Sequence, residues 1–153
     1  MKSMFLPLLF SLIILCSCSD ENPSAPQIDL SMFSGNWSGT QTILQAGQCS
    51  ISGGDSISVP ITLTWVVDNN GNVTIQNPQS GNESWSGKVE PNMDISLEKS
   101  FSVNCFGTVR NETSSYNGTI EQKSGSFTVN MEAIEDWCPP ACIFRIRYSL
   151  VKQ

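Results

Sequence analysis

The six cysteines are the residues of this chain with the widest chemical repertoire. Cys16 and Cys18 end an apolar N-terminal stretch, and the other four are spread over the rest of the chain. An even number of cysteines in an oxidising compartment usually forms disulfides, here two. The alternatives are a four-cysteine zinc site and a redox or copper-binding site at the Cys-x-x-x-Cys pair. The four cysteines concerned are Cys49, Cys105, Cys138 and Cys142.

Residues 138–142 (CPPAC) constrain how these cysteines pair. Two adjacent prolines favour extended backbone, which separates Cα atoms four residues apart by about 12 Å. A disulfide requires its two Cα atoms to lie within about 7 Å. We therefore expect Cys138 and Cys142 to bond to Cys49 and Cys105 rather than to each other.

Catalytic chemistry finds little support, because the chain has no histidine. This absence excludes Ser-His-Asp and Cys-His nucleophile systems and removes the commonest metal ligand. Glu132, Glu135 and Asp136 are carboxylates of the kind that glycoside hydrolysis uses, but no second cluster can be placed opposite them. Residues 68–71 (DNNG) offer oxygen ligands for calcium, yet they fit a hairpin turn better. We predict no catalytic residue, metal or cofactor, and therefore a protein that is not an enzyme.

The four tryptophans are the candidates for ligand contact, because aromatic rings supply large apolar surfaces for stacking. Trp65 lies on a strong apolar stripe and is expected in the core. Trp37 is expected to plug one end of the fold. Trp85 and Trp137 each lie near a predicted turn, so we predict that these two bind a ligand such as a sugar ring.

Alternation of apolar and polar residues predicts that β-strands carry these side chains. Every odd position of residues 57–67 is apolar, and residues 101–105, 127–133 and 142–150 repeat the pattern. Residues 33–153 are therefore expected to form a single all-β domain, an antiparallel meander of about 8–10 strands. Because open sheet edges invite aggregation, we expect a small closed barrel, with a β-sandwich as the alternative.

Residues 33–37 (FSGNW) resemble the Gly-x-Trp opening of lipocalin-like and avidin-like barrels, which continue as an up-and-down meander. The resemblance implies a closed barrel over residues 33–153. The chain departs from lipocalins because no helix is predicted near its C-terminus. It departs from fatty-acid-binding proteins because Arg145 and Arg147 fall on the outer face of the last strand. We therefore carry over no ligand chemistry from these families.

An apolar segment precedes this domain. Residues 4–15 are almost wholly apolar, and about a dozen residues are too few to span a bilayer, which needs about 20. Residues 15–18 (LCSC) resemble the bacterial lipobox, which implies cleavage before Cys18 and lipidation of Cys18. Residues 19–22 (SDEN) resemble the export signal of Bacteroidetes surface lipoproteins, with a plain polar linker as the alternative.

The predicted organisation has three parts. Residues 1–17 are a lipoprotein signal peptide, residues 18–32 are the lipidated cysteine and a disordered tether, and residues 33–153 are the barrel domain. The lipid on Cys18 is expected to attach the protein to a membrane. The expected location is the cell envelope, as an outer-membrane lipoprotein that faces the periplasm or the cell surface.

The net charge of −6 and the lack of any basic run argue against nucleic acid as a partner. We expect a non-enzymatic binding module for a small apolar ligand or a glycan. The alternatives are a protein-interaction module, such as a protease or lysozyme inhibitor, and a structural component of the envelope. A ligand carrier should show an internal cavity lined by the odd-numbered residues of 57–67. An inhibitor should show a filled core and a protruding loop at residues 45–56 or 135–142.

Overall fold

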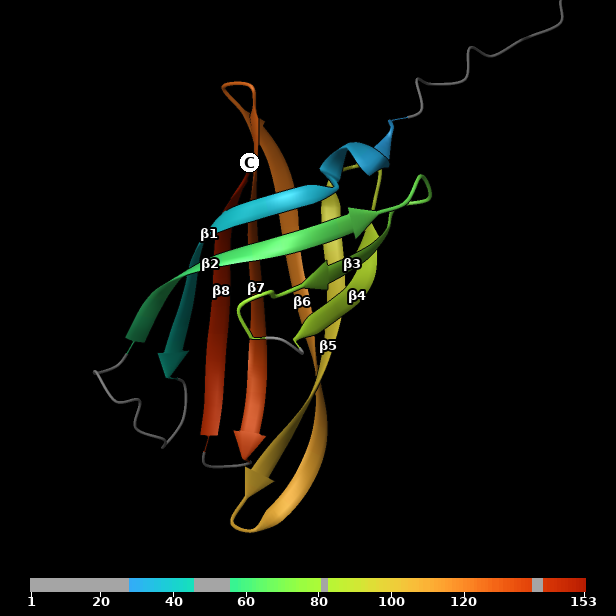
Figure 1. Cartoon of the computed structure of the whole chain (residues 1–153). Coiled ribbons are helices and arrows are strands. Elements are labelled where there is room, and N and C mark those ends of the chain that lie inside the picture. The colour runs from blue at the N-terminus through green and yellow to red at the C-terminus, as the bar shows by residue number, and fades with distance from the viewer. Residues whose placement is uncertain (1–27, 46–55, 81–82, 139–141) are drawn as a thin grey trace, which may run out of the picture.

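The computed structural model describes residues 28–45, 56–80, 83–138 and 142–153. They form a short 3-10 helix followed by eight β-strands (Figure 1). Within this part of the chain, no helix has the length and apolar character needed to cross a membrane. The elements are η1 (Leu30–Phe33), β1 (Gly35–Gln45), β2 (Ser56–Val67), β3 (Asn72–Gln76), β4 (Ser84–Val89), β5 (Asp94–Cys105), β6 (Thr108–Lys123), β7 (Ser126–Cys138) and β8 (Cys142–Lys152).

The eight strands form one closed antiparallel barrel, in which each strand pairs with its neighbours in sequence order. The first and last strands complete the closure. Their ladder runs from Trp37 opposite Lys152 to Gln45 opposite Phe144. The predicted meander and its closure as a barrel are confirmed, and the sandwich alternative is wrong. Closure pairs β1 and β8 with each other, so neither is left as an open edge.

The same alternation that predicted the strands separates the inside of the barrel from its outside, because successive side chains of a strand point to opposite faces. Along β8, Phe144, Ile146 and Tyr148 are buried, whereas Arg145 and Arg147 are exposed. The two arginines therefore lie on the outer face, as predicted.

One end of the barrel is closed by η1 and by two stacked tryptophans. The indole Nε1 of Trp37 donates a hydrogen bond to the carbonyl of Phe33 at 3.0 Å. The Trp37 ring stacks on the Trp65 ring, with ring centroids 4.4 Å apart. Both indoles are buried, so the roles predicted for Trp37 and Trp65 are confirmed. Leu30 and Phe33 are 4% and 0% exposed. The folded domain therefore begins before residue 33, and the last residues of the predicted tether belong to it.

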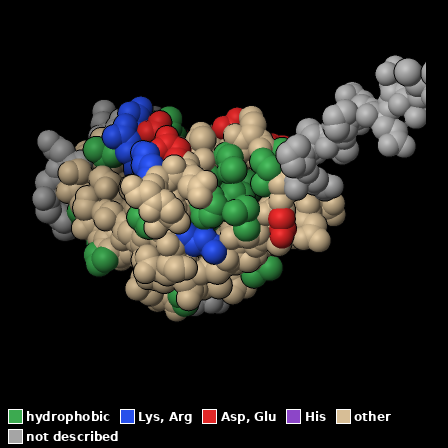
Figure 2. Space-filling model, turned by 90° about the horizontal axis from the view of Figure 1, so that it is seen from above, with side chains coloured by type: hydrophobic (Ala, Val, Ile, Leu, Met, Phe, Trp, Pro, Cys, Tyr) green, Lys and Arg blue, Asp and Glu red, His purple; other side chains and the backbone are tan. Residues whose placement is uncertain are grey.

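The outer surface of this closed end carries hydrophobic side chains next to the point where the described chain begins (Figure 2). Ile28 and Met32 are 38% and 41% exposed. Burial of Leu30 and Phe33 and exposure of Met32 mean that η1 has one face on the core and one on solvent. A helix of a single turn is too short to produce a helical periodicity in the sequence, which is why it was not predicted.

Residues 68–71 connect β2 to β3 as the tight turn that the sequence predicted. The carboxylate of Asp68 accepts hydrogen bonds from the backbone N–H groups of Asn70 and Asn72, at 2.9 and 2.8 Å. The φ angle of Gly71 is 82°, a conformation that glycine adopts without the steric cost of a side chain. The hydrogen bonds within the turn occupy the Asp68 carboxylate and explain why the pKa of Asp68 is below its ordinary value, with the bond from the Asn72 side chain as the largest cause.

The barrel wall is uneven in height. β3 and β4 contain 5 and 6 residues, whereas β5 and β6 contain 12 and 16. β3 pairs with β2 only at residues 64–67, and β4 pairs with β5 only at residues 95–98. β5 and β6 continue past these pairings as a hairpin that projects from the barrel at the end opposite η1 (Figure 1). We call this end the mouth.

Several predicted features lie outside the described residues. They are the signal peptide at residues 1–17, the lipidation site Cys18, most of the tether and the disulfide candidate Cys49. Most of the loop at residues 45–56 and the tripeptide at residues 139–141 lie outside as well.

Candidate binding site at the barrel mouth

The inner face of the barrel is sealed at the η1 end and partly open to solvent at the mouth. Along β2, Leu63 is 1% exposed and Ile61 is 5% exposed, whereas Val59 is 37% exposed. A single strand thus runs from the filled core to an inner surface that solvent reaches. We use the name mouth wall for the inward-facing apolar residues that stay partly exposed at this end: Ile43, Ile57, Val59, Phe101 and Val103.

Lys99 lies on the inner face of β5, between the filled core and the mouth wall. Its side chain is 7% exposed, and Nζ lies 3.0 Å from Glu83 Oε1 and 3.3 Å from Glu135 Oε1. Nζ also faces the rings of Trp85 and Phe101, at 5.3 and 5.5 Å from their centroids. Because a buried ammonium loses its hydration, it requires such carboxylates and ring faces as replacements.

Glu135, on β7, is the more deeply buried of the two carboxylates and is 1% exposed. Its Oε1 accepts hydrogen bonds from the Tyr116 hydroxyl and from Lys99. Its Oε2 accepts a hydrogen bond from the indole Nε1 of Trp137 at 2.6 Å. Donors from β5, β6 and β7 therefore fix this carboxylate in place, as a buried charge requires. We call Lys99, Glu83, Glu135, Tyr116 and Trp85 the Lys99 cluster.

Aromatic rings close the inner side of the Lys99 cluster. Trp85 packs edge-on against Tyr116 and Tyr148, with ring centroids 6.2 and 6.0 Å apart. Gln41 donates a hydrogen bond to the Tyr148 hydroxyl at 2.9 Å. Burial, and then the negative charge of Glu135, raise the pKa of both tyrosines above the ordinary value. Both phenols therefore stay protonated near neutral pH, so they serve as hydrogen-bond donors and not as bases.

Glu83 is the exposed member of the Lys99 cluster. Its side chain is 39% exposed, and Oε2 accepts hydrogen bonds from Asn77 Nδ2 at 3.0 Å and Ser80 Oγ at 2.9 Å. Partial burial opposes ionisation of Glu83, but the hydrogen bond and attraction from Lys99, with these two further bonds, outweigh it. The pKa of Glu83 is therefore lowered from its ordinary value.

Of the two tryptophans predicted to bind ligand, Trp85 belongs to the Lys99 cluster, and Trp137 contacts it through the hydrogen bond to Glu135. Trp85 is only 2% exposed, so a ligand could reach it only through the side chains that cover it, and its predicted role in ligand binding stays a prediction. Its strand β4 pairs with β3, and the side chain points inward. Trp137 is 38% exposed at the mouth and packs against Phe144, with ring centroids 4.8 Å apart.

The carboxylates that are close in sequence do not form one site. Glu132 is exposed on the outer face, where Oε2 accepts a hydrogen bond from Arg147 at 2.9 Å. This bond is the main reason why the pKa of Glu132 is below its ordinary value. Glu135 lies on the inner face, because residues three apart on a strand point to opposite faces. Across the described ranges, no group of three or more metal-ligating side chains comes together.

Sequence reasoning missed Lys99 and Glu83. A signal for Lys99 was present, because it interrupts the apolar alternation of Ile95, Leu97, Phe101 and Val103 along β5. A charged residue at an inward position needs a buried partner, so the break in the pattern pointed to an internal ion pair. No local signal pointed to Glu83, whose contact with Lys99 depends on where β4 begins.

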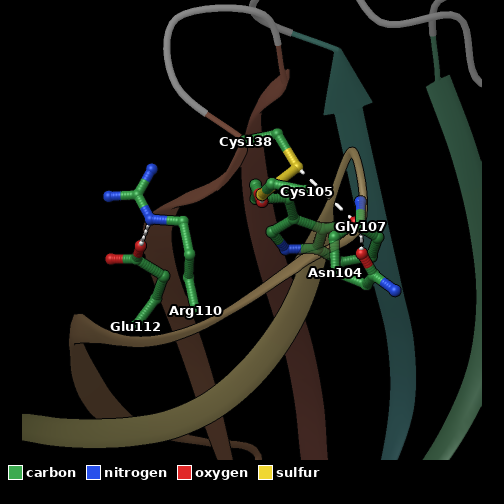
Figure 3. The surroundings of a disulfide bond; sticks show 7 residues. Asn104, Cys105, Gly107, Arg110, Glu112 and Cys138 are labelled. Atoms are coloured by element: carbon green, nitrogen blue, oxygen red, sulfur yellow. Dashed lines mark hydrogen bonds and ion pairs between the residues drawn. A yellow bond between two sulfur atoms is a disulfide. The ribbon is translucent and has the colours of Figure 1, made fainter.

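A disulfide between Cys105 and Cys138 ties the β5–β6 hairpin to the end of β7 at the mouth (Figure 3). The Cα atoms are 5.5 Å apart. Cys142 is disulfide-bonded as well, and its partner lies outside the described residues. Cys138 thus pairs with one of its two expected partners. We had argued that an extended 138–142 segment holds Cys138 and Cys142 too far apart to bond. That reason was wrong, because the two residues face each other across the β7–β8 ladder.

A groove of about 850 Å³ lies on the outer faces of β1, β6, β7 and β8. It is lined largely by hydroxyl and amide side chains, among them Thr40, Thr113, Asn117 and Asn130. Neither this groove nor a smaller one beside residues 90–96 is lined by the odd-numbered residues of β2. Of that β2 stripe, the residues from Ile61 to Val67 are buried, and only the two that belong to the mouth wall, Ile57 and Val59, keep partial exposure.

No protein-family model matches the chain, and a search of curated proteins finds no similar sequence.

Proposed function

We propose that this protein is a non-enzymatic binding module of the cell envelope, which takes a small, largely apolar ligand at the barrel mouth. The observation that carries the proposal is the change of exposure along β2, from 1% at Leu63 to 37% at Val59. Apolar side chains that face inward and still meet solvent are a surface that a ligand can cover. Burial of such surface is the main favourable term in binding small molecules.

The Lys99 cluster supports the same proposal. A barrel that needed only stability would gain more from apolar side chains at these positions, because a buried ion pair rarely repays its desolvation. Here the cluster lies directly beside the mouth wall, through Phe101, which faces the Lys99 ammonium. Ligand sites typically combine an apolar lining with a few fixed polar groups of this kind.

Attachment to the membrane is the second part of the proposal. The apolar residues 4–15 and the lipobox-like residues 15–18 support a lipid on Cys18. The protein would then be an outer-membrane lipoprotein, facing the periplasm or the cell surface, with the membrane as its partner through that lipid. Metabolic labelling with a palmitate analogue tests this directly. Label should enter the wild-type chain and be absent from the variant Cys18→Ala.

Two valines of β2 provide a matched test of the binding site. Val59 faces the mouth and Val66 faces outward at 64% exposure, so Val59→Glu should impair binding and Val66→Glu should not. The probe is N-phenyl-1-naphthylamine, whose fluorescence rises in apolar surroundings. We expect Val59→Glu to weaken its binding roughly 10-fold or more, because binding would bury a carboxylate. Equal binding to both variants, or no binding to the wild type, would contradict the proposed site.

A protein-interaction module is the second candidate, because of one residue. Phe106, at the tip of the β5–β6 hairpin, is 93% exposed, and the adjacent Cys105 anchors the tip to β7. A rigid loop that presents an aromatic side chain loses little entropy on binding a protein. This protruding element is not one of the two loops that we predicted. A photo-crosslinking amino acid at position 106, in cells, should capture a discrete partner if this candidate is correct.

A further inference from the structure

The two carboxylates that contact Lys99 are held very differently. Glu135 is 2% exposed at its side chain and receives hydrogen bonds from Tyr116 and Trp137 as well as Lys99. Glu83 is 39% exposed, and its other two partners, Asn77 and Ser80, come from its own connection between β3 and β4. The fold fixes Glu135, whereas Glu83 reaches Lys99 from the solvent side.

We propose that Glu83 occupies the position of a ligand's acidic head group, so that the natural ligand is an amphipathic carboxylate. The incoming carboxylate would displace that of Glu83 from Lys99, and Glu83 would turn to solvent. This inference rests on the proposed function, and it names the class of ligand that the mouth would take.

Charge balance favours this exchange over the alternatives. Replacing one carboxylate by another leaves the charges around the Lys99 ammonium unchanged, so the buried ion never loses a partner. A cationic head group would be repelled by Lys99, which cannot move aside easily. Its side chain is 7% exposed and lies between the rings of Trp85 and Phe101. A neutral head group would leave the pair of Lys99 and Glu83 as it is and gain nothing from it.

The surroundings of Lys99 also provide for the rest of such a ligand. Phe101 faces the Lys99 ammonium and belongs to the mouth wall. An alkyl chain attached to a carboxylate at Lys99 can therefore continue along the exposed inner surface, where it covers Phe101 and Val103. The polar head and the apolar body of one molecule would then bind to adjoining surfaces.

Three ligands with the same tail separate the contribution of the head group from that of the tail. They are dodecanoate, dodecan-1-ol and dodecylammonium, each measured by displacement of N-phenyl-1-naphthylamine from the full mature protein. The two ions are used below their micelle concentrations and the alcohol below its solubility limit. On the wild type we expect dodecanoate to bind more tightly than dodecan-1-ol, and dodecylammonium to bind most weakly. In the variant Glu83→Ala, dodecanoate should bind roughly 3- to 10-fold more tightly, since the internal competitor is gone.

The control variant is Glu90→Ala. Glu90 pairs with Lys88 at 3.0 Å, but this pair is about half exposed and lies at the closed end. Its removal should leave all three affinities unchanged. A second variant, Lys99→Met, should abolish the preference for dodecanoate over dodecan-1-ol. Should Lys99→Met fail to fold, Glu83→Ala still decides the matter.

The possible failures can be told apart. Equal wild-type affinity for dodecanoate and dodecan-1-ol would overturn the head-group assignment and leave the mouth as a binding site. The head-group assignment also fails if Glu83→Ala binds dodecanoate no better than the wild type does. If none of the three ligands displaces the probe, the proposed function fails together with this inference.

Discussion

Among single residues, Lys99 is the one that holds most of the surrounding side chains at the mouth in place. Its ammonium is buried between Glu83, Glu135 and two aromatic rings, and these partners come from β4, β5, β7 and the connection before β4. A buried charge of this kind holds its neighbours in one arrangement only while every partner is present. Removing the ammonium should therefore affect stability as well as binding.

The variant Lys99→Met should lower the free energy of unfolding by about 3–5 kcal/mol, because it leaves the Glu135 carboxylate buried without its cation. Urea denaturation, followed by tryptophan fluorescence, measures this change. The double variant Lys99→Met/Glu135→Gln should recover part of the loss, since a neutral amide needs no counter-ion. Lys88→Met, at an exposed pair, should cost less than about 1 kcal/mol. Equal losses for Lys99→Met and Lys88→Met would show that the Lys99 cluster is hydrated.

The pH dependence of the free energy of unfolding should reflect the ionisation of Glu83. Its pKa in the folded protein lies below the ordinary value of 4.5. A lowered pKa means that Glu83 contributes stability above pH 4.5, and that this contribution is lost as the pH falls through the folded-state pKa. The variant Glu83→Gln should therefore lose less stability than the wild type between about pH 5 and pH 3. Identical slopes for the two proteins over this range would mean that Lys99 does not hold Glu83 ionised.

At the scale of elements, the long β5–β6 hairpin is the part of the fold that depends on a covalent restraint. Beyond residue 98, β5 pairs with β6 but not with β4, so one side of it lacks a strand partner among the described residues. The disulfide from Cys105 to Cys138 holds the tip of this hairpin against the end of β7. The restraint therefore acts on the hairpin that carries Phe101 and Val103 of the mouth wall.

Removing this disulfide as Cys105→Ala/Cys138→Ala should lower the free energy of unfolding by about 2–4 kcal/mol. The bond closes a loop with a sequence separation of 33 residues, so it restricts the unfolded chain substantially. Chemical denaturation gives the total loss. Limited proteolysis locates it, because cleavage should increase near Phe106 while the rest of the barrel stays protected. Unchanged protection at Phe106 would mean that the hairpin is rigid without the bond.

Four of the eight strands, β2, β5, β7 and β8, could be located because their inner faces are apolar and their outer faces are polar, which produces a period of two. The short β3 and β4 limit the height of the barrel wall, and their lengths depend on how they pair with each other, with β2 and with β5, which no local sequence pattern records. The 138–142 segment shows a second limit. Proline propensity alone suggested a straight segment, but the β7–β8 ladder brings Cys138 and Cys142 opposite each other. The site was predicted only in part, because Trp85, Trp137 and Glu135 were singled out without Lys99, which contacts Trp85 and Glu135.

At the scale of the whole molecule, an even number of antiparallel strands places η1 and the last residues of β8 at the same end, opposite the mouth (Figure 1). Asn36 and Gln153 lie side by side there, joined by a backbone hydrogen bond of 2.9 Å. If Cys18 carries a lipid, the ten or so residues between it and Ile28 span at most about 35 Å. The closed end would then lie near the bilayer, and the mouth would face away from it.

The ladder between β1 and β8 also sets the order in which the barrel can fold. Gln41 and Tyr148, joined by a hydrogen bond across this ladder, are separated by 107 residues. Contacts between such distant residues form slowly, and here they must wait until the final strand has been made. If the chain is exported in the unfolded state, it benefits from this delay, since the barrel would not close before translocation is nearly complete. Until β8 arrives, β1 and β7 each keep an unpaired edge, so the nascent domain needs protection from aggregation during that interval.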